Sequence, residues 1–397
     1  MRILYIALSC GPNLGSEDAV GWNVPMDMAA RGHEVYVLTR SDKREEIEAY
    51  RAVHPNLAYP EFRYQPLSKV AEACKGPLYS LRAKMWCSDA SATVCALCKD
   101  LHPDVVHQLT PVEFRAPVDL TDINAFKVLG PVGGAGDMPN AFDRYLRFAD
   151  RCIEGLRAHL NSRAVREPAT KRAYAAFDVV MAANEETRVA VSPLCSHDVV
   201  LHSEVAVKRL FPVMEPVQRA GNELVIGFAG RLHYRKGVAF LLDCVQRMST
   251  PFRLLIAGDG PERERIETLV RERGLTDKVD LLGRVPYDKM AEFYRRIDVL
   301  AFPSFREATG SVIIEALAAG VPVVSLGIFG ASVVLADNPG FLVGCEGSLE
   351  DIAERFAATL DAVARGERIF DWSGRDCLSV CSLATFFENS YREGVRL

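Results

Sequence analysis

Residues 306–322 read REATGSVIIEALAAGVP, which combines a loop, an apolar helix, a turn and the start of a strand. Two glutamates, Glu307 and Glu315, flank a turn of small residues and the first half of the helix. The first N–H groups of a helix have no partner within it, and small residues let a phosphate approach them closely. The flanking carboxylates can accept hydrogen bonds from sugar hydroxyls. The stretch therefore favours a site for a hydroxyl-rich, phosphorylated ligand; the alternative is a helix with a polar start and one half-exposed glutamate.

The composition is typical of a soluble globular protein with two domains. The chain has 397 residues, more than one ordinary core accommodates, and 49% of them are hydrophobic and 25% charged. The formal net charge of −5 gives no reason to expect a nucleic-acid partner. Residues 1–11 lack the features of a signal peptide, and the eleven cysteines follow no framework spacing. We therefore expect a cytoplasmic protein with reduced thiols.

Strands and helices alternate along the chain in two series. The strands expected in the first series cover residues 2–9, 33–39, 104–107, 125–129 and 178–182, with a helix at 21–31. The strands expected in the second series cover residues 224–230, 252–257, 279–282, 299–302 and 321–325, with helices at 238–248, 262–273 and 287–296. This alternation is typical of parallel sheets in doubly wound domains, so the predicted class is α/β.

The irregular segment 211–222 separates the two series and predicts a linker. We expect an N-terminal Rossmann-like domain over residues 1–210, on the acceptor side, and a C-terminal Rossmann-like domain over residues 223–381. The last helix, at about 382–397, is amphipathic and is expected to pack back on the first domain. Ligands of doubly wound folds bind at the carboxyl ends of the strands, so we expect the two domains to face each other across a cleft that holds the site.

A loop with several cations, Gly230-Arg-Leu-His-Tyr-Arg-Lys-Gly237, follows the first strand of the second series. Arg231 offers a planar fork and Lys236 a mobile point charge, which together can neutralise a diphosphate. Two solvated surface cations are the alternative. No two aspartates lie two positions apart, so the chain lacks the D-x-D pattern that holds Mg²⁺ or Mn²⁺ with a nucleotide. We expect no metal ion, and the cations and the helix start at Gly310 would stabilise the leaving diphosphate instead.

The spacing of Glu307 and Glu315 argues against a hydrolytic pair. If residues 307–315 were all helical, the two Cα atoms would lie about 12 Å apart along the axis and roughly 80° around it. Glycosidases need their carboxyl groups about 5–5.5 Å apart for retention or about 6.5–9.5 Å apart for inversion. The pair is therefore expected to make two contacts with one extended ligand.

Taken together, the motifs of this chain resemble the retaining glycosyltransferases of family 4, which have the GT-B fold. In the second half the resemblance rests on the loop 230–237, on LLIAGDGPE at 254–262, on LLGRVPYDKMAEFY at 281–294 and on the E-x(7)-E pair. In the first half a subset of the family shares Gly15-Ser-Glu with Gly21-Trp, His107-Gln-Leu-Thr and Gly130-Pro-Val-Gly-Gly134. The resemblance extends nearly from end to end.

The resemblance implies a sugar-nucleotide site that is formed mainly by the C-terminal domain. Arg231 and Lys236 would hold the diphosphate, Glu315 would bind the ribose, and Glu307 would contact the donor sugar. Backbone groups at the start of the helix would meet the phosphates, and those after the strand 279–282 would meet the base. These residues are Thr309, Gly310 and Ser311 for the phosphates, and Arg284 and Val285 for the base.

The resemblance also assigns two positions in the N-terminal domain. Gly15, in the loop 11–15, would approach the donor sugar and the acceptor. His107 would lie at the reaction centre, so that His107 and Glu307 are the expected catalytic residues. Without the resemblance, a single histidine after a strand is more often a structural residue.

The implied reaction is retaining transfer of a sugar from a nucleotide-diphosphate sugar, with a UDP-sugar as the expected donor. The acceptor would be a hydroxyl of a small molecule, a glycan or a lipid-linked compound. Attack from the front face, with the leaving phosphate helping to take the proton, would need neither a protein nucleophile nor a cofactor. A sugar-nucleotide epimerase, a phosphorylase or a non-catalytic sugar-nucleotide-binding protein are the alternatives, since a fold does not determine a function.

Two further features bear on the acceptor. Four acidic residues near the N-terminal loops would suit a cationic acceptor such as an amino sugar or an aminocyclitol: Glu17, Asp18, Glu113 and Asp137. The basic, partly apolar stretch 69–86 would suit peripheral contact with the inner face of a membrane. For both features a solvated or paired surface is the alternative.

Overall fold

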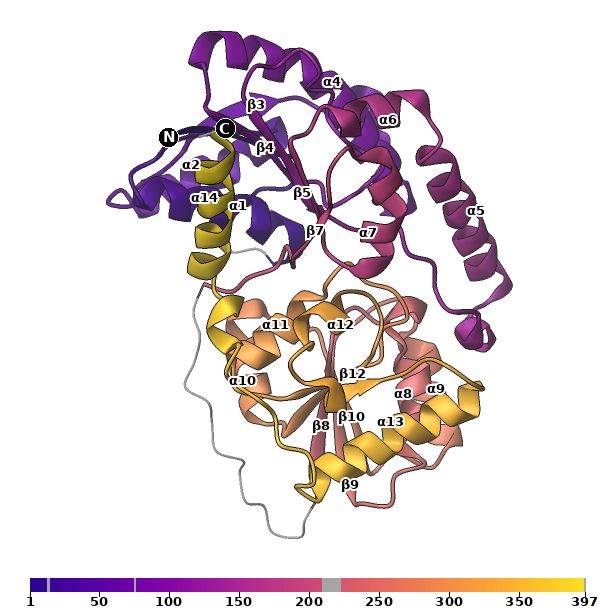
Figure 1. Cartoon of the computed structure of the whole chain (residues 1–397). Coiled ribbons are helices and arrows are strands. Elements are labelled where there is room, and N and C mark those ends of the chain that lie inside the picture. Colours follow the sequence, from indigo (N-terminus) through magenta and orange to yellow (C-terminus); the bar gives the residue numbers. More distant parts are fainter. Residues whose placement is uncertain (13–14, 75, 209–222, 396–397) are drawn as a thin grey trace. The chain divides into compact units, whose positions relative to one another are not determined.

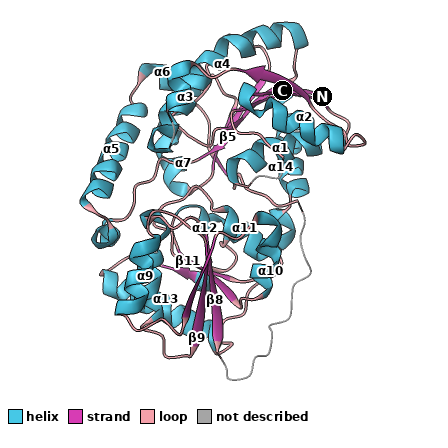
Figure 2. Cartoon of the chain, turned by 180° about the vertical axis from the view of Figure 1, so that it is seen from behind, coloured by secondary structure: helices cyan, strands magenta, loops and turns pink. Residues whose placement is uncertain are grey.

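The computed structural model describes residues 1–12, 15–74, 76–208 and 223–395. The chain forms two compact units, each of which contains a parallel sheet with helices on its faces (Figures 1 and 2). Unit 1 comprises Met1–Gly136, Arg157–Lys208 and Ser379–Leu397, and unit 2 comprises Asp137–Leu156 and Arg209–Leu378. The prediction of two doubly wound α/β domains is confirmed, whereas the predicted linker 211–222 lies outside the described residues.

The sheet of unit 1 has the strand order β3-β2-β1-β4-β5-β6-β7, and the pairs are parallel. Its strands are β1 Arg2–Ala7, β2 Glu34–Arg40, β3 Glu61–Gln65, β4 Val105–Thr110, β5 Phe126–Val132, β6 Val179–Ala182 and β7 Val200–Leu201. The chain runs outward from β1 to β3 and then returns to add β4 on the other side of β1. The topological switch point of this unit therefore lies between β1 and β4.

Unit 1 is covered by several helices, of which α5 is shared with unit 2 because the division between the units falls within it. They are α1 Ser16–Ala30, α2 Arg44–Val53, α3 Lys69–Ala73, α4 Tyr79–Leu101, α5 Phe148–Ala164, α6 Pro168–Ala175, α7 Glu185–Val191 and α14 Val380–Val395. Helix α1 begins at Ser16, earlier than the expected residue 21, so Gly21 lies inside the helix. A Cβ atom at Gly21 would lie 2.0 Å from the carbonyl oxygen of Ser9, so this glycine permits close packing of α1 on the chain after β1.

The C-terminal helix α14 belongs to unit 1, where it lies beside α1 (Figure 1). It begins at Val380 rather than near residue 382. Its buried face consists of Leu383, Ala384, Phe387 and Tyr391, which pack in one apolar cluster with residues of β1, β2 and α1. Glu388, whose side chain is largely buried, forms an ion pair with Arg31, the C-cap of α1, with 3.0 Å between the charged atoms.

The sheet of unit 2 has the strand order β10-β9-β8-β11-β12-β13. Its strands are β8 Leu224–Ala229, β9 Phe252–Ala257, β10 Val279–Gly283, β11 Val299–Phe302, β12 Val323–Leu326 and β13 Leu342–Val343. Its helices are α8 Val238–Val245, α9 Arg263–Glu272, α10 Met290–Arg295, α11 Ser311–Ala318, α12 Phe329–Val334 and α13 Leu349–Ala364. No helix in the described ranges is both long and apolar enough to cross a membrane.

The segment Asp137–Leu156 belongs to unit 2, although the predicted boundary at residue 210 assigned it to the first domain. Its short 3₁₀ helix, Asn140–Tyr145, inserts two aromatic rings into the core of unit 2. The ring of Phe142 stacks on Phe305, with 4.2 Å between the ring centroids, and it contacts Phe240 edge-on. Long-range burial of this kind is not visible in a pattern of alternating strands and helices. The C-terminal limit of the unit is Leu378, close to the predicted residue 381.

The packing of α14 makes a testable prediction. Phe387→Ala should lower the free energy of unfolding by about 3–5 kcal/mol, because the ring is completely buried in unit 1. Phe386→Ala is the matched control and should lower the free energy of unfolding clearly less, because the ring of Phe386 is only partly buried. Urea denaturation followed by the fluorescence of the buried Trp22 and Trp86 in unit 1 provides the measurement. Equal losses for the two variants would contradict the packing of α14.

Candidate functional site

The candidate site lies at the switch point of unit 2, where strands β8 and β11 are neighbours. The loop 230–237 follows β8 and the loop 303–310 follows β11, so both leave the same edge of the sheet. The backbone N–H of Phe305 donates to the carbonyl of Arg235 over 2.7 Å, which joins the two loops directly. Ligands of doubly wound folds bind at this position.

Two glycines allow close packing at the site: Gly237 between the two loops, and Gly310 against the end of β11. Gly237 has a φ of +68°, and a Cβ atom there would lie 2.1 Å from the carbonyl oxygen of Pro303. Gly310 has a φ of +93°, and a Cβ atom there would lie 2.5 Å from the ring of Phe302. Both the backbone conformation and the available space therefore require glycine at these two positions.

Lys236 and Glu307, one from each loop, form an ion pair with 2.5 Å between Nζ and Oε1. Each of these two side chains exposes only 18% of its surface. Burial by itself would raise the pKa of Glu307, but Lys236, Arg235 and Arg306 together hold this pKa below its ordinary value. Glu307 is therefore an ionised carboxylate at neutral pH, in a region where positive charge predominates.

Helix α11 begins four residues after Glu307, and the ring of Phe302 contacts both its N-cap residue, Gly310, and Lys236, whose Nζ lies 5.7 Å from the ring centroid. Gly310 has no side chain to accept a hydrogen bond from the first turn. The N-terminal amides of Ser311 and its neighbours therefore carry partial positive charge next to Lys236. The preceding residue, Thr309, is completely buried, backbone included, so its predicted contact with the phosphates is not supported, whereas the backbone at 310–311 is partly exposed.

Glu315 lies on the first turns of α11, in surroundings unlike those of Glu307. Its Oε2 accepts a hydrogen bond from the hydroxyl of Tyr294 over 3.0 Å. Burial raises the pKa of Glu315, and the hydrogen bond from Tyr294 opposes this increase. Tyr287, which is 60% exposed, lies near enough for Glu315 to influence its pKa. Neither tyrosine was among the predicted site residues, although both lie in the motif 281–294.

The segment between the two glutamates is helical only from Ser311 onward, so the axial separation expected for a continuous helix does not apply. The two carboxylates differ in their partners: Glu307 pairs with Lys236, and Glu315 accepts a hydrogen bond from Tyr294. They are therefore suited to two different contacts.

The remaining predicted donor residues lie around this centre. Arg231 is exposed in the loop after β8 and contributes to the lowered pKa of His233. Arg284 is exposed and Val285 is half-buried in the turn after β10, two strands away from β8. The turn continues to Tyr287, which connects it to the neighbourhood of Glu315. Unit 2 thus contains all the predicted donor residues except Gly15.

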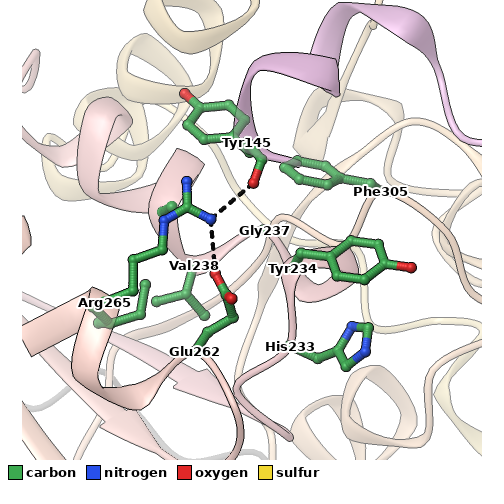
Figure 3. A pocket seen from close by; sticks show the side chains of 10 residues that line it. Tyr145, His233, Tyr234, Gly237, Val238, Glu262, Arg265 and Phe305 are labelled. Carbon is green, nitrogen blue, oxygen red and sulfur yellow. Dashed lines mark hydrogen bonds and ion pairs between the residues drawn. The ribbon is translucent and has the colours of Figure 1, made fainter. Parts of the chain in front are cut away.

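A small cavity beside Gly237 is not the ligand site. Figure 3 shows its lining, in which the guanidinium of Arg265 donates to Glu262 over 2.9 Å and to the carbonyl of Tyr145 over 2.8 Å. Its volume of about 10 Å³ holds no more than one water molecule. The cavity therefore belongs to the packing of the segment 137–156 behind the two loops.

In unit 1, Gly15 is the exposed N-cap of α1 at the carboxyl end of β1, and residues 13 and 14 of the same loop lie outside the described residues. Its φ of −96° is open to any residue, and a Cβ atom would meet nothing within 4 Å. Neither backbone conformation nor lack of space therefore requires glycine here, and the predicted approach of Gly15 to a ligand stays a prediction.

The predicted catalytic role of His107 is not supported by the structure. Strand β4 extends to Thr110, so His107 lies in the middle of a strand and not in the loop after it. Its side chain is 0% exposed and packs against Tyr5 and Phe387. A ring in this position cannot reach a substrate, and His107 is a structural residue.

The hydrogen bonds of His107 identify its tautomer. Nε2 lies 2.6 Å from the carbonyl oxygen of Gly130, which can only accept, so Nε2 carries the proton. Nδ1 therefore accepts from the hydroxyl of Tyr391, 2.5 Å away, and this oxygen in turn accepts from the hydroxyl of Tyr5. Burial lowers the pKa of His107 to about 4, so the imidazole is neutral. The relay connects α14 with the strands β1, β4 and β5.

Three of the four acidic residues considered for a cationic acceptor have partners within unit 1. Glu17 is half-buried and accepts from Tyr79, Ser9 and the backbone of Val112, and burial raises its pKa. Asp18 forms an ion pair with Lys43 at 3.0 Å, and Glu113 forms one with Arg115 at 2.9 Å. The fourth, Asp137, belongs to unit 2. In unit 1, Glu17, Asp18 and Glu113 are therefore paired, which favours the alternative of a paired surface.

The basic stretch 69–86 is partly neutralised in the same way. Lys84 forms an ion pair with Glu167 at 2.6 Å, and Arg82 lies 3.9 Å from Asp42. Of the other two cations, Lys69 is exposed at the start of α3, and Lys75 lies outside the described residues. The charge of the stretch therefore gives little support for contact with a membrane.

Comparisons with known proteins match the region that contains this site. Residues 213–366, which contain both loops and α11, match the family model described as "Glycosyl transferases group 1". The chain is 33% identical over 140 residues to a 2-deoxystreptamine glucosyltransferase of Streptomyces kanamyceticus, and this match covers 34% of the chain and 36% of the relative. The chain thus matches only about a third of the length of that relative.

Two solved structures resemble the whole chain. The lipopolysaccharide outer core galactosyltransferase WaaB, in its apo form, superposes with a TM-score of 0.66 and 15% identity, and the match covers 99% of both chains. The protein HepE of Anabaena, in complex with UDP and glucose, superposes with a TM-score of 0.58 and 16% identity over 99% of this chain and 100% of that one. The fold is therefore GT-B, as the sequence predicted.

The neutral state of His107 makes a prediction about pH. A histidine that titrates at 6.5 in the unfolded chain and at about 4 in the folded protein destabilises the fold as the pH falls between these values. Its share of the loss from pH 7 to pH 5 is about 2 kcal/mol. Denaturation at both pH values measures how far the free energy of unfolding falls from pH 7 to pH 5. This fall should be smaller for His107→Gln than for the wild type, and it should equal the wild-type value for the exposed control His159→Gln. An unchanged decrease in His107→Gln would contradict the neutral, buried imidazole.

Proposed function

We propose that this protein is a glycosyltransferase that binds a nucleotide-diphosphate sugar at the switch point of unit 2 and transfers the sugar to a hydroxyl acceptor. The observation that carries the proposal is the ion pair of Lys236 and Glu307 beside the start of α11. It brings a cation, a helix N-terminus and an ionised carboxylate together at the position where this fold binds ligands.

Each part of the donor has a matching group. The diphosphate is stabilised by Lys236, by the exposed Arg231 and by the amides at the start of α11. Glu307 accepts hydrogen bonds from the sugar hydroxyls, and Glu315, beside Tyr294, accepts them from the ribose. The turn at 284–287 meets the base. In the free protein, Glu307 attracts the ammonium group of Lys236. A diphosphate bound between Lys236 and the helix start would take over part of this attraction.

The proposed reaction retains the configuration of the sugar. The acceptor oxygen forms a bond to the anomeric carbon on the face from which the diphosphate leaves, and the bond between this carbon and the phosphate oxygen breaks. The acceptor proton passes to the leaving phosphate oxygen. The charge that develops on the diphosphate is stabilised by Lys236 and the helix start, which are already in place before the reaction.

A UDP-sugar is the proposed donor, and no metal ion is required. Support for the nucleotide comes from HepE, a structure of the same fold that was solved with UDP and glucose. Support for the absence of a metal requirement comes from the cations at the site, since they can neutralise the diphosphate themselves. The acceptor is proposed only as a hydroxyl compound.

The first test measures nucleotide release from a panel of sugar nucleotides, with and without candidate acceptors. We expect acceptor-dependent release of UDP and loss of most turnover in Lys236→Ala, because the diphosphate loses its nearest cation. Lys278→Ala is the control, because this exposed lysine precedes β10 at the opposite edge of the sheet, and it should keep normal turnover. Other main products would contradict transfer: free sugar would indicate hydrolysis, an isomerised donor would indicate epimerisation, and a sugar phosphate would indicate phosphorolysis.

The second test concerns metal ions. Turnover in excess EDTA should stay within about twofold of the untreated value, because cationic side chains rather than Mg²⁺ or Mn²⁺ stabilise the leaving diphosphate. The comparison requires the same donor and acceptor in both reactions, with Mg²⁺ added back in a third. Complete loss of turnover in EDTA with recovery on Mg²⁺ would refute the metal-independent proposal.

A further inference from the structure

Glu154, on the part of α5 that belongs to unit 2, contacts both loops of the candidate site. Its Oε1 accepts a hydrogen bond from the hydroxyl of Tyr234 over 2.8 Å and one from Nη2 of Arg306, also over 2.8 Å. Tyr234 begins the short turn that ends at Lys236, and Arg306 directly precedes Glu307. One carboxylate oxygen therefore joins the two loops one layer behind the Lys236–Glu307 ion pair.

The charges around this layer explain why a carboxylate is needed. Arg235, Lys236 and Arg306 all lie close enough to Glu307 to lower its pKa. Arg306 is 13% exposed and forms its ion pair with Glu154, which is 12% exposed, so water screens the pair only weakly. Without Glu154, the guanidinium of Arg306 would lose this partner, and the adjacent Glu307 would be the nearest alternative carboxylate.

We propose that Glu154 is a positioning residue for the donor site: by binding Arg306 and Tyr234, it keeps Arg306 away from Glu307 and leaves Glu307 to Lys236. The expected effect of Glu154 on turnover rests on the proposed function. The expected effect of Glu154 on the Lys236–Glu307 ion pair does not. Glu154 would touch neither the donor nor the acceptor.

The segment that carries Glu154 is well anchored in unit 2, as positioning requires. Phe142 and Tyr145 pack against Phe305, which directly precedes Arg306. Arg265 holds the carbonyl of Tyr145 from the other side, as Figure 3 shows. Burial and the bond to Glu154 raise the pKa of Tyr234, so its hydroxyl remains a donor at neutral pH.

The test uses the full-length protein with Glu154→Ala, Glu154→Gln and the double variant Glu154→Ala/Arg306→Ala. The control is Glu350→Ala, because Glu350 binds Arg144 of the same segment at 3.0 Å, in an exposed pair on α13. Glu154→Ala should lower kcat about 10- to 100-fold, as expected for displaced catalytic groups, with a smaller change in KM for the donor. Glu154→Gln keeps an acceptor for Tyr234 but loses the negative charge, so its kcat should lie between those of the wild type and Glu154→Ala.

The double variant distinguishes positioning from general stability. If Arg306 disturbs Glu307 once Glu154 is absent, then removing Arg306 as well should restore part of the lost kcat. A merely structural role predicts the opposite, because a second buried truncation would lower stability further. No recovery in the double variant, or normal kcat in Glu154→Ala, would overturn the proposal.

A second readout needs no nucleotide. The rate at which an amine-acylating reagent modifies Lys236, followed by mass spectrometry relative to Lys278, reports how firmly Glu307 holds the ammonium group. We expect severalfold faster modification in Glu154→Ala and an unchanged rate in Glu350→Ala. If the wild type releases no nucleotide from any donor, the proposed function fails, and the modification rates still decide the role of Glu154. Equal rates in wild type and Glu154→Ala would overturn it.

Discussion

The ion pair of Lys236 and Glu307 is the interaction on which the candidate site depends. It lies where β8 and β11 are neighbours, and the two loops can meet there because Gly237 leaves room for the backbone of Pro303. A largely buried ion pair contributes little net stability, because desolvation of both ions offsets their attraction. Its value is therefore in placing a cation and an anion beside the start of α11, where a ligand can exchange partners with both.

Electrostatics distinguishes the two glutamates that first drew attention to this region. Three cations keep Glu307 ionised, whereas burial beside Tyr294 raises the pKa of Glu315. Two carboxylates at the ends of one short segment thus have different partners, as the proposed contacts with different parts of a ligand require. The carboxylate Glu154 extends the same arrangement by one layer, since it binds the cation that lies next to Glu307.

The sequence was sufficient for the class of fold and for the donor loops, because both depend on local patterns. Buried strands of parallel sheets appear as apolar runs, and the loop 230–237 and the start of α11 can be recognised from glycines and charges that are close in sequence. Short strands at or near the sheet edges, such as β7 and β13, were not expected, since two residues make no pattern. The role of His107 and the position of the segment 137–156 depend on contacts between residues far apart in the chain, such as that of His107 with Tyr391.

The most direct test of this account is a crystal structure of the protein with bound UDP. The account predicts that the β-phosphate lies within hydrogen-bond distance of Lys236 Nζ and of the backbone amides at 310–312, with the ribose hydroxyls at Glu315. UDP bound elsewhere in unit 2, or bound with its phosphates away from Lys236 and the start of α11, would contradict it.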